Sequence, residues 1–220
     1  MKHTGGRLAA GLVLLAVLGL TLSCQSGPQR DWLVYSGPVE VSVDAGDSIP
    51  GTGLRYLGRT EQGAEMLIGD QKAICKVGDS LDYKGEPAQG VRLNLALRVA
   101  WYDAERLHAV GTVELAVRDP QPQPMPVAGA SPLHHTVPIL YWVERGRAIP
   151  GTTITYQGKT DQGALLGGME GYPYRKTADS ILWEGRLRDG VWLRLEGRTG
   201  FFDDDRLQVL GLATVWVDLK

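Results

Sequence analysis

The fold is decided by residues 191–217, which read VWLRLEGRTGFFDDDRLQVLGLATVWV. Apolar side chains occupy alternate positions before and after the acidic tripeptide in this stretch. Alternation with a period of two predicts two antiparallel strands, each with one face in the core. We therefore expect the odd-numbered positions to face the core, and Asp203-Asp204-Asp205 to form the turn of a long hairpin.

The same pattern occurs one hundred residues earlier, in residues 91–117. The offset extends upstream, since Ile49-Pro50-Gly51-Thr52 recurs at 149–152. Between positions 49 and 118, 24 of 70 residues are identical to the residue one hundred positions later. Self-similarity at a fixed offset indicates a duplicated structural unit. The sequence predicts one unit at residues 32–118 and its copy at residues 138–220.

Short alternating segments and frequent glycine turns dominate both copies, and no helical periodicity is sustained beyond the N-terminal segment. This pattern is typical of small antiparallel β domains. We predict an all-β protein with two tandem homologous domains of about six to seven strands each. A barrel and a sandwich both fit the pattern.

Residues 119–137 separate the copies. Six of the twelve prolines lie between Asp119 and Pro138, and several alternate with glutamine. Alternating proline disfavours helix and sheet and favours an extended, semi-rigid spacer. The segment is therefore predicted to be a linker.

The N-terminus has the features of an export signal. Lys2 and Arg7 precede an apolar run from Leu8 to Leu22, and Ser23-Cys24 follow. The run is too short for a typical transmembrane helix and suits a secretory signal. An ordinary cleaved signal or an uncleaved anchor, with an incidental cysteine, is the alternative.

These residues resemble the signal peptide and lipobox of bacterial lipoproteins. The resemblance covers the first two dozen residues, although Thr21 and Leu22 depart from the commonest pattern. It implies a signal peptide at 1–23, an acylated Cys24 carrying palmitate-type chains, and a lipidated tether at 24–31. Because residue 25 is Gln rather than Asp, it implies the outer membrane, facing the periplasm, in a two-membrane bacterium. In other bacteria it implies the outer face of the cytoplasmic membrane.

The charge and cysteine content of the mature chain narrow its partners. Without residues 1–23 the chain has 21 Lys and Arg against 25 Asp and Glu, a net charge of −4. This balance argues against a nucleic-acid partner, which requires a concentrated basic surface. Cys75 is the only other cysteine, so we expect neither an intrachain disulfide nor a cysteine-based metal cluster.

Few residues are candidates for catalysis or for metal binding. Asp203, Asp204 and Asp205 are weak candidates for calcium ligands, but three acids supply too few oxygens and are ordinary at a polar turn. Asp79-Ser80 recurs at 179–180 without a histidine shared by both copies, and His108 becomes Gln208. We interpret His108 as a solvated surface residue. The sequence thus predicts no catalytic constellation, no metal and no cofactor.

The second copy is richer in aromatic residues than the first. If Phe202 pairs with Arg206, Trp192 lies opposite Trp216 on the outward face of the hairpin. An outward apolar face is either covered by another part of the chain or available to a partner. The candidate binding surface comprises Trp192, Trp216, Leu210, Leu212, Tyr172 and Tyr174.

These observations predict a lipid-anchored, extracytoplasmic, non-catalytic binding or scaffolding module of the cell envelope. Its ligand is not specified by the sequence; an envelope protein or a saccharide would suit exposed tryptophans. The alternatives are an accessory or inhibitor subunit in envelope assembly, and an envelope-polymer hydrolase.

Overall fold

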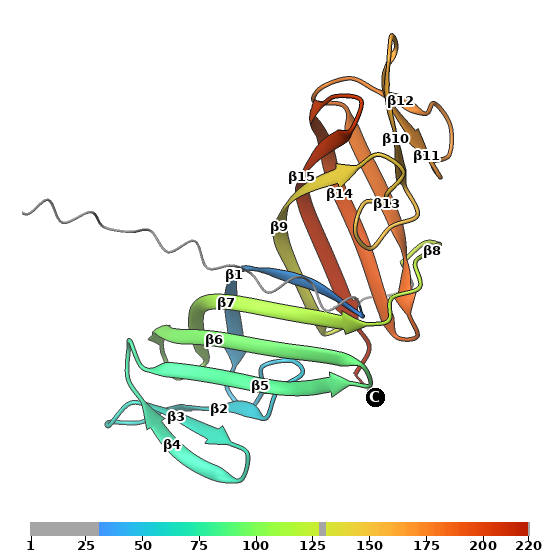
Figure 1. Ribbon diagram of the computed structural model, residues 1–220. Coiled ribbons are helices and arrows are strands. Elements are labelled where there is room, and N and C mark those ends of the chain that lie inside the picture. Colours follow the sequence, from blue (N-terminus) through green and yellow to red (C-terminus); the bar gives the residue numbers. More distant parts are fainter. Residues whose placement is uncertain (1–30, 128–130, 220) are drawn as a thin grey trace, which may run out of the picture.

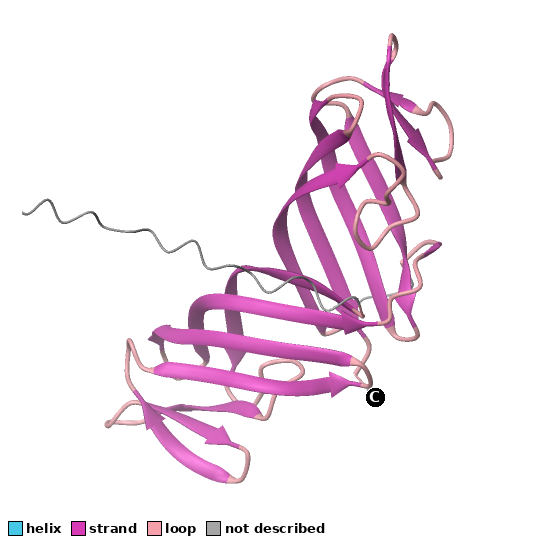
Figure 2. Ribbon diagram, in the orientation of Figure 1, coloured by secondary structure: helices cyan, strands magenta, loops and turns pink. Residues whose placement is uncertain are grey.

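The computed structural model describes residues 31–127 and 131–219 (Figure 1). Within these ranges the chain forms antiparallel strands and no helix (Figure 2), so the all-β prediction is confirmed. No helix that could cross a membrane is found among the described residues. The predicted signal peptide and Cys24 lie outside them.

The first copy contains a four-stranded and a three-stranded sheet. The larger sheet has the order β1-β7-β6-β5, and the smaller one is the meander β2-β3-β4. The strands are β1 (Trp32–Asp44), β2 (Leu54–Arg59), β3 (Ala64–Ile68), β4 (Gln71–Cys75), β5 (Ser80–Ala88), β6 (Val91–Tyr102) and β7 (Arg106–Arg118).

The second copy repeats this topology, with an additional short strand, β8 (Gln123–Pro124), at the edge of its main sheet. Its main sheet has the order β8-β13-β14-β15-β9, and its small sheet is β10-β11-β12. The strands are β9 (Leu133–Glu144), β10 (Thr155–Thr160), β11 (Gly163–Gly167), β12 (Tyr174–Arg175), β13 (Ser180–Arg188), β14 (Val191–Phe202) and β15 (Arg206–Val217). Because each main sheet ends in two unjoined edge strands, it is an open sheet and not a closed barrel.

Odd-numbered residues of the long strands form the core, as the alternation predicts. Leu93, Leu95, Leu193 and Leu195 are all at most 2% exposed. Buried side chains of the small sheets, such as Tyr56 and Tyr156, belong to the same cluster as the inward side chains of the main sheets. In the first copy the Tyr56 hydroxyl donates to the carbonyl of Asp103, and this bond recurs between the matching residues one hundred positions later.

The two copies pack against each other in a reciprocal manner. A Cβ built at Gly51 would lie 2.7 Å from Cδ2 of Leu133, and one built at Gly151 would lie 3.0 Å from Cδ2 of Leu33. Thus the same pair of positions makes the contact in both directions, as in a two-fold symmetric dimer. The buried residues of both copies accordingly form one contiguous cluster.

Part of the proline-rich segment is paired with the second copy. Strand β8 (Gln123–Pro124) lies along the outer edge of β13 (Figure 1). Gln121 N–H donates to the carbonyl of Leu187 and Met125 N–H to that of Glu184. An edge strand needs donors only at alternate residues, so prolines at the intervening positions are tolerated. Our expectation that this segment disfavours sheet is therefore wrong for these residues.

Candidate binding surface

Trp192 and Trp216 lie opposite each other on the outward face of β14 and β15, in the register predicted from the sequence. Both are half-buried, and the Arg194 guanidinium lies 5.6 Å from the Trp216 ring centroid. The indole Nε1 of Trp192 is buried without a hydrogen-bond partner. Near the turn a bulge between Thr199 and Phe202 shifts the pairing by one residue.

Leu210 and Leu212 are exposed and have apolar neighbours on β9. Leu210 pairs with Leu140, and Leu212 pairs with Pro138. Leu140 is 61% exposed and is the most exposed of these leucines. The pattern of residues 191–217 does not indicate which strand lies beside β15, so the predicted set contains no residue of β9.

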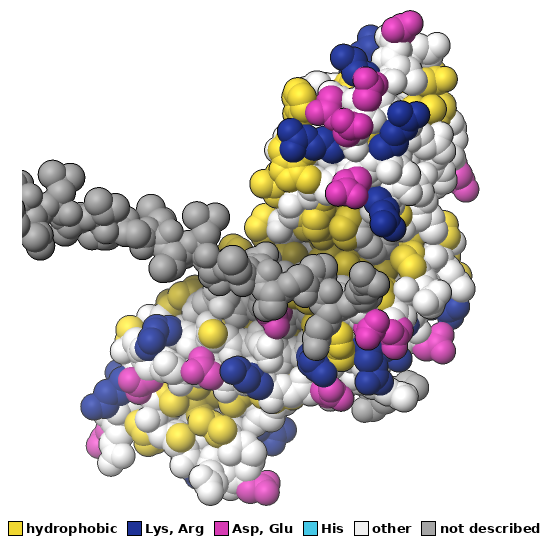
Figure 3. Space-filling view, viewed as in Figure 1, with side chains coloured by type: hydrophobic (Ala, Val, Ile, Leu, Met, Phe, Trp, Pro, Cys, Tyr) yellow, Lys and Arg dark blue, Asp and Glu magenta, His cyan; other side chains and the backbone are white. Residues whose placement is uncertain are grey.

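Trp142 extends this surface toward the turn. It is 49% exposed, and its ring centroid lies 6.3 Å from that of Phe201. Because the bulge precedes Phe202, Phe201 departs from the inward alternation and joins the outward side. Hydrophobic side chains are visible along the β9 side of the second copy in Figure 3. We define the apolar face as Pro138, Leu140, Trp142, Leu182, Phe201, Leu210 and Leu212.

The first copy has polar or smaller residues at most of the matching positions. The pairs, first copy then second, are Glu40 and Leu140, Ser42 and Trp142, Asp82 and Leu182, and Thr112 and Leu212. The inward-facing positions are apolar in both copies, except that buried Thr199 stands where the first copy has Val99. Since one fold is built with either outward face, packing of the module does not require the apolar one.

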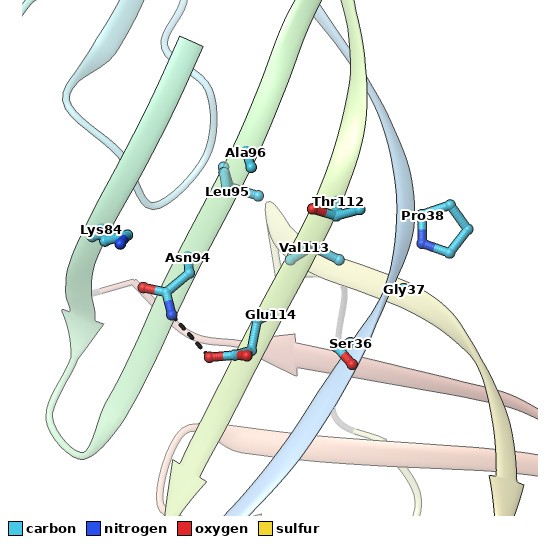
Figure 4. Close-up of a pocket in the computed structure, with 10 residues that line it drawn as sticks. All are labelled: Ser36, Gly37, Pro38, Lys84, Asn94, Leu95, Ala96, Thr112, Val113 and Glu114. Carbon is cyan, nitrogen blue, oxygen red and sulfur yellow. Dashed lines mark hydrogen bonds between the residues drawn. The ribbon is translucent and has the colours of Figure 1, made fainter. Parts of the chain in front are cut away.

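The outward face of the first copy is also hollowed. A groove of about 510 Å³ lies over β1, β5, β6 and β7 (Figure 4). Its lining includes Lys84, Ala96 and Thr112, and Asn94 Nδ2 donates to Glu114 Oε1 at 2.9 Å. In the second copy Glu196 and Leu212 replace Ala96 and Thr112, so larger side chains stand at the matching place.

One polar cluster of the first copy has the atom order of a Ser-His-Glu triad. Ser42 Oγ lies 3.2 Å from His108 Nε2, and His108 Nδ1 lies 3.4 Å from Glu40 Oε1. The imidazole stacks on Trp101 with centroids 3.9 Å apart. His108 lies on the outward face as expected, but its side chain is only 18% exposed, so it is less solvated than we predicted.

The cluster departs from a working triad in two respects. His108 Nδ1 is buried and has no partner in hydrogen-bond geometry, and Glu40 is 70% exposed. A carboxylate that orients a catalytic histidine is normally buried and hydrogen-bonded to Nδ1–H. The cluster therefore contains the residue types of a nucleophilic site, but its carboxylate is exposed to solvent.

Tyr172 and Tyr174 lie on or beside the small sheet of the second copy, apart from the tryptophan pair. Their ring centroids are 5.4 Å apart, and the Tyr172 hydroxyl donates to Gln162 Oε1 at 3.1 Å. Tyr174 pairs with Leu165 on β11. The structure thus separates the two tyrosines from the other four candidate residues, which lie on the main sheet.

The acidic turn is organised by its own backbone. Asp203 Oδ1 accepts the N–H groups of Arg206 and Asp205, and these bonds lower the pKa of the Asp203 carboxyl below its ordinary value. Asp103 accepts the same pair of bonds in the first copy. Among residues 31–127 and 131–219, no three His, Cys, Asp or Glu side chains are grouped to hold a metal ion.

No protein-family model, curated protein or solved structure was found to match this chain. The class that the structure defines is an all-β protein built from a duplicated antiparallel unit.

Proposed function

We propose that the protein is a lipid-anchored binding or scaffolding module of the cell envelope, and that it binds its partner through the apolar face of the second copy. The observation that carries the proposal is the difference between matched positions. Leu140, Trp142 and Leu212 stand where the first copy has Glu40, Ser42 and Thr112. A duplicated unit that differs in this way on one face has acquired a property there that folding does not need.

The size of the apolar face supports a binding role. Six of its side chains, excluding Pro138, are between 41% and 61% exposed. Together they present roughly 600 Å² of apolar surface, the upper end of the largest patch on ordinary monomers. Removing that area from water at about 25 cal/mol per Å² would contribute substantially to association. An envelope protein or a saccharide stacked on Trp142 suits this surface.

The location of this module follows from the resemblance at the N-terminus. We propose that Cys24 is acylated and that the chain is exported. Acyl chains anchor stably when two or more are attached, since each buried CH₂ contributes about 0.8 kcal/mol. Only residues 25–31 separate Cys24 from the start of the first copy at Trp32, so the first copy would lie close to the membrane.

Replacing the anchor tests the location. The Cys24→Ser variant is expected in the soluble extracytoplasmic fraction, and the wild type in the membrane fraction. Mass spectrometry of the mature N-terminus should show the acyl chains on Cys24. A Cys24→Ser variant that stays in the membrane fraction would refute the anchor.

Placing residues of the first copy at the matching positions of the second copy tests the binding surface. The variant Leu140→Glu/Trp142→Ser/Leu212→Thr carries the residues of the first copy. The matched control is Val110→Thr, an equally exposed outward position of the first copy. In crosslinking of intact cells, the triple variant is expected to lose the adducts that the wild type and the control form. Unchanged adducts in a folded triple variant would contradict the proposal.

The cluster of Ser42, His108 and Glu40 favours a hydrolase as a second candidate. Ser42 Oγ would attack an ester or amide carbon while His108 Nε2 accepts its proton. A fluorophosphonate probe should then label the wild type and the Ser36→Ala control but not Ser42→Ala. Absence of labelling would remove this candidate.

A further inference from the structure

We infer that the apolar face is covered by a second copy of this chain, so that the protein forms a two-fold symmetric dimer through its distal repeats. This inference rests on the proposed function, because it names the partner of that same surface. A two-fold contact uses one patch on both subunits, so the patch must be complementary to itself. The area of the apolar face and the charges within it both allow such self-complementary contact.

The area of the face matches what a dimer requires. Two apolar faces in contact would remove about 1,200 Å² of side-chain surface from water, the lower limit for stable protein interfaces. Backbone and polar atoms at the margin add to this figure. Sheets with apolar faces commonly pack face to face in this way, with interdigitating side chains about 10 Å deep.

The charges within the face are complementary under a two-fold rotation. Glu196 and Arg198 project from β14 in the middle of the face, in the rows of Leu212 and Leu210. Glu196 has no ion pair among the described residues, and Arg198 donates to the carbonyl of Ala178 through Nη1 alone. When two such faces meet in antiparallel orientation, each Glu196 can reach the partner's Arg198. The first copy has Ala96 and Arg98, and so lacks the acid of this pair.

Membrane attachment would favour the contact. Two tethered molecules share a thin layer at the membrane surface, which raises their effective concentration without new contacts. A two-fold axis along the membrane normal keeps both anchors on the same side. Modest affinity between the faces is therefore sufficient.

Single cysteines on the face test the dimer in the full-length, membrane-attached protein. Leu140→Cys and Leu210→Cys are treated with a short bismaleimide, and Glu40→Cys and Val110→Cys are the matched controls. The control positions pair on β1 and β7 as Leu140 and Leu210 pair on β9 and β15. Cys75 is buried and present in every variant. We expect a crosslinked dimer from Leu140→Cys and Leu210→Cys and no crosslinked dimer from the two control variants.

A charge exchange tests the orientation. Sedimentation of the purified protein should show a dimer for wild type, a weakened dimer for Glu196→Arg, and recovery for Glu196→Arg/Arg198→Glu. Recovery requires that the two positions meet across the interface, which a general loss of solubility or stability would not produce.

The outcomes separate this inference from the proposed function. Crosslinking of Leu140→Cys to a different envelope component, with no dimer, overturns the inference and leaves the proposed binding surface intact. Equal dimer yields from the face and control cysteines also overturn it. If the face cysteines give no adduct of any kind, both the dimer and the binding surface are wrong.

Discussion

Leu133 of the second copy lies over Gly51 of the first, with its Cδ2 2.7 Å from the place where a Cβ of Gly51 would stand. The same contact occurs in reverse between Leu33 and Gly151. Each copy therefore completes the packing of the other at a glycine that leaves room for a leucine. This relationship explains why one buried cluster extends through both copies.

Substitution of two glycines with the same φ would measure the cost of filling that space. Gly146 and Gly151 both have φ of +78°, but only Gly151 has neighbours within 4 Å of an added Cβ. Gly146→Ala should lower the free energy of unfolding by about 1–2 kcal/mol through backbone strain alone. Gly151→Ala should cost about 1–3 kcal/mol more because of overpacking against Tyr35, Leu193 and Leu33. Urea denaturation measures both; equal losses would show that the contact between the copies is loose.

Leu133→Ala tests whether the copies unfold together. The side chain is 1% exposed, so its truncation should cost about 2–5 kcal/mol. Because Leu133 packs on the first copy, we expect one cooperative transition that shifts as a whole. Leu140→Ala, at a 61% exposed position, is the control and should change stability by less than about 0.5 kcal/mol. Two transitions, only one of them shifted, would show that the copies unfold independently.

We expect the protein to lose stability in mild acid, because His135 is partly buried. Burial, with a smaller contribution from the charge of His134, lowers its pKa from 6.5 to about 4. The folded state therefore binds this proton less readily than the unfolded state. The stabilisation by the neutral imidazole is complete above pH 6.5 and is lost as the pH falls toward 4, by about 2–3 kcal/mol.

The His135→Gln variant isolates this effect from the titration of carboxyl groups. Its free energy of unfolding should depend less on pH than that of the wild type between pH 6.5 and 4. Chemical denaturation at several pH values gives the comparison. Parallel pH profiles for the two proteins would contradict the assignment to His135.

We expect Asp203 to stabilise the acidic turn through its hydrogen bonds to the backbone. Its carboxyl oxygen accepts two backbone N–H groups, and an asparagine oxygen can accept the same bonds. Asp203→Asn should keep the melting temperature near that of wild type, whereas Asp203→Ala should lower it. Calcium should leave all three melting temperatures unchanged. A rise in melting temperature with calcium, lost in Asp203→Ala, would indicate an ion site instead.

The sequence by itself determined the strand pattern and the repeat. Period-two alternation assigns each residue to a face, and this assignment depends only on local backbone geometry. The burial of Leu193 and the position of Trp192 opposite Trp216 were therefore predictable from the 191–217 hairpin alone. The offset of one hundred residues likewise predicted that both copies have the same strand order.

Only the tertiary structure decided which segments meet. Leu140 reaches Leu210 because β9, distant in sequence from β15, pairs along its edge. Tyr174 and Trp192 are both aromatic residues of the second copy, yet they lie on different sheets. The Gly51–Leu133 contact and the pairing of β8 with β13 also join segments whose approach no local pattern encodes. Alternation specifies the face on which a side chain lies, whereas strand order and packing specify its neighbours.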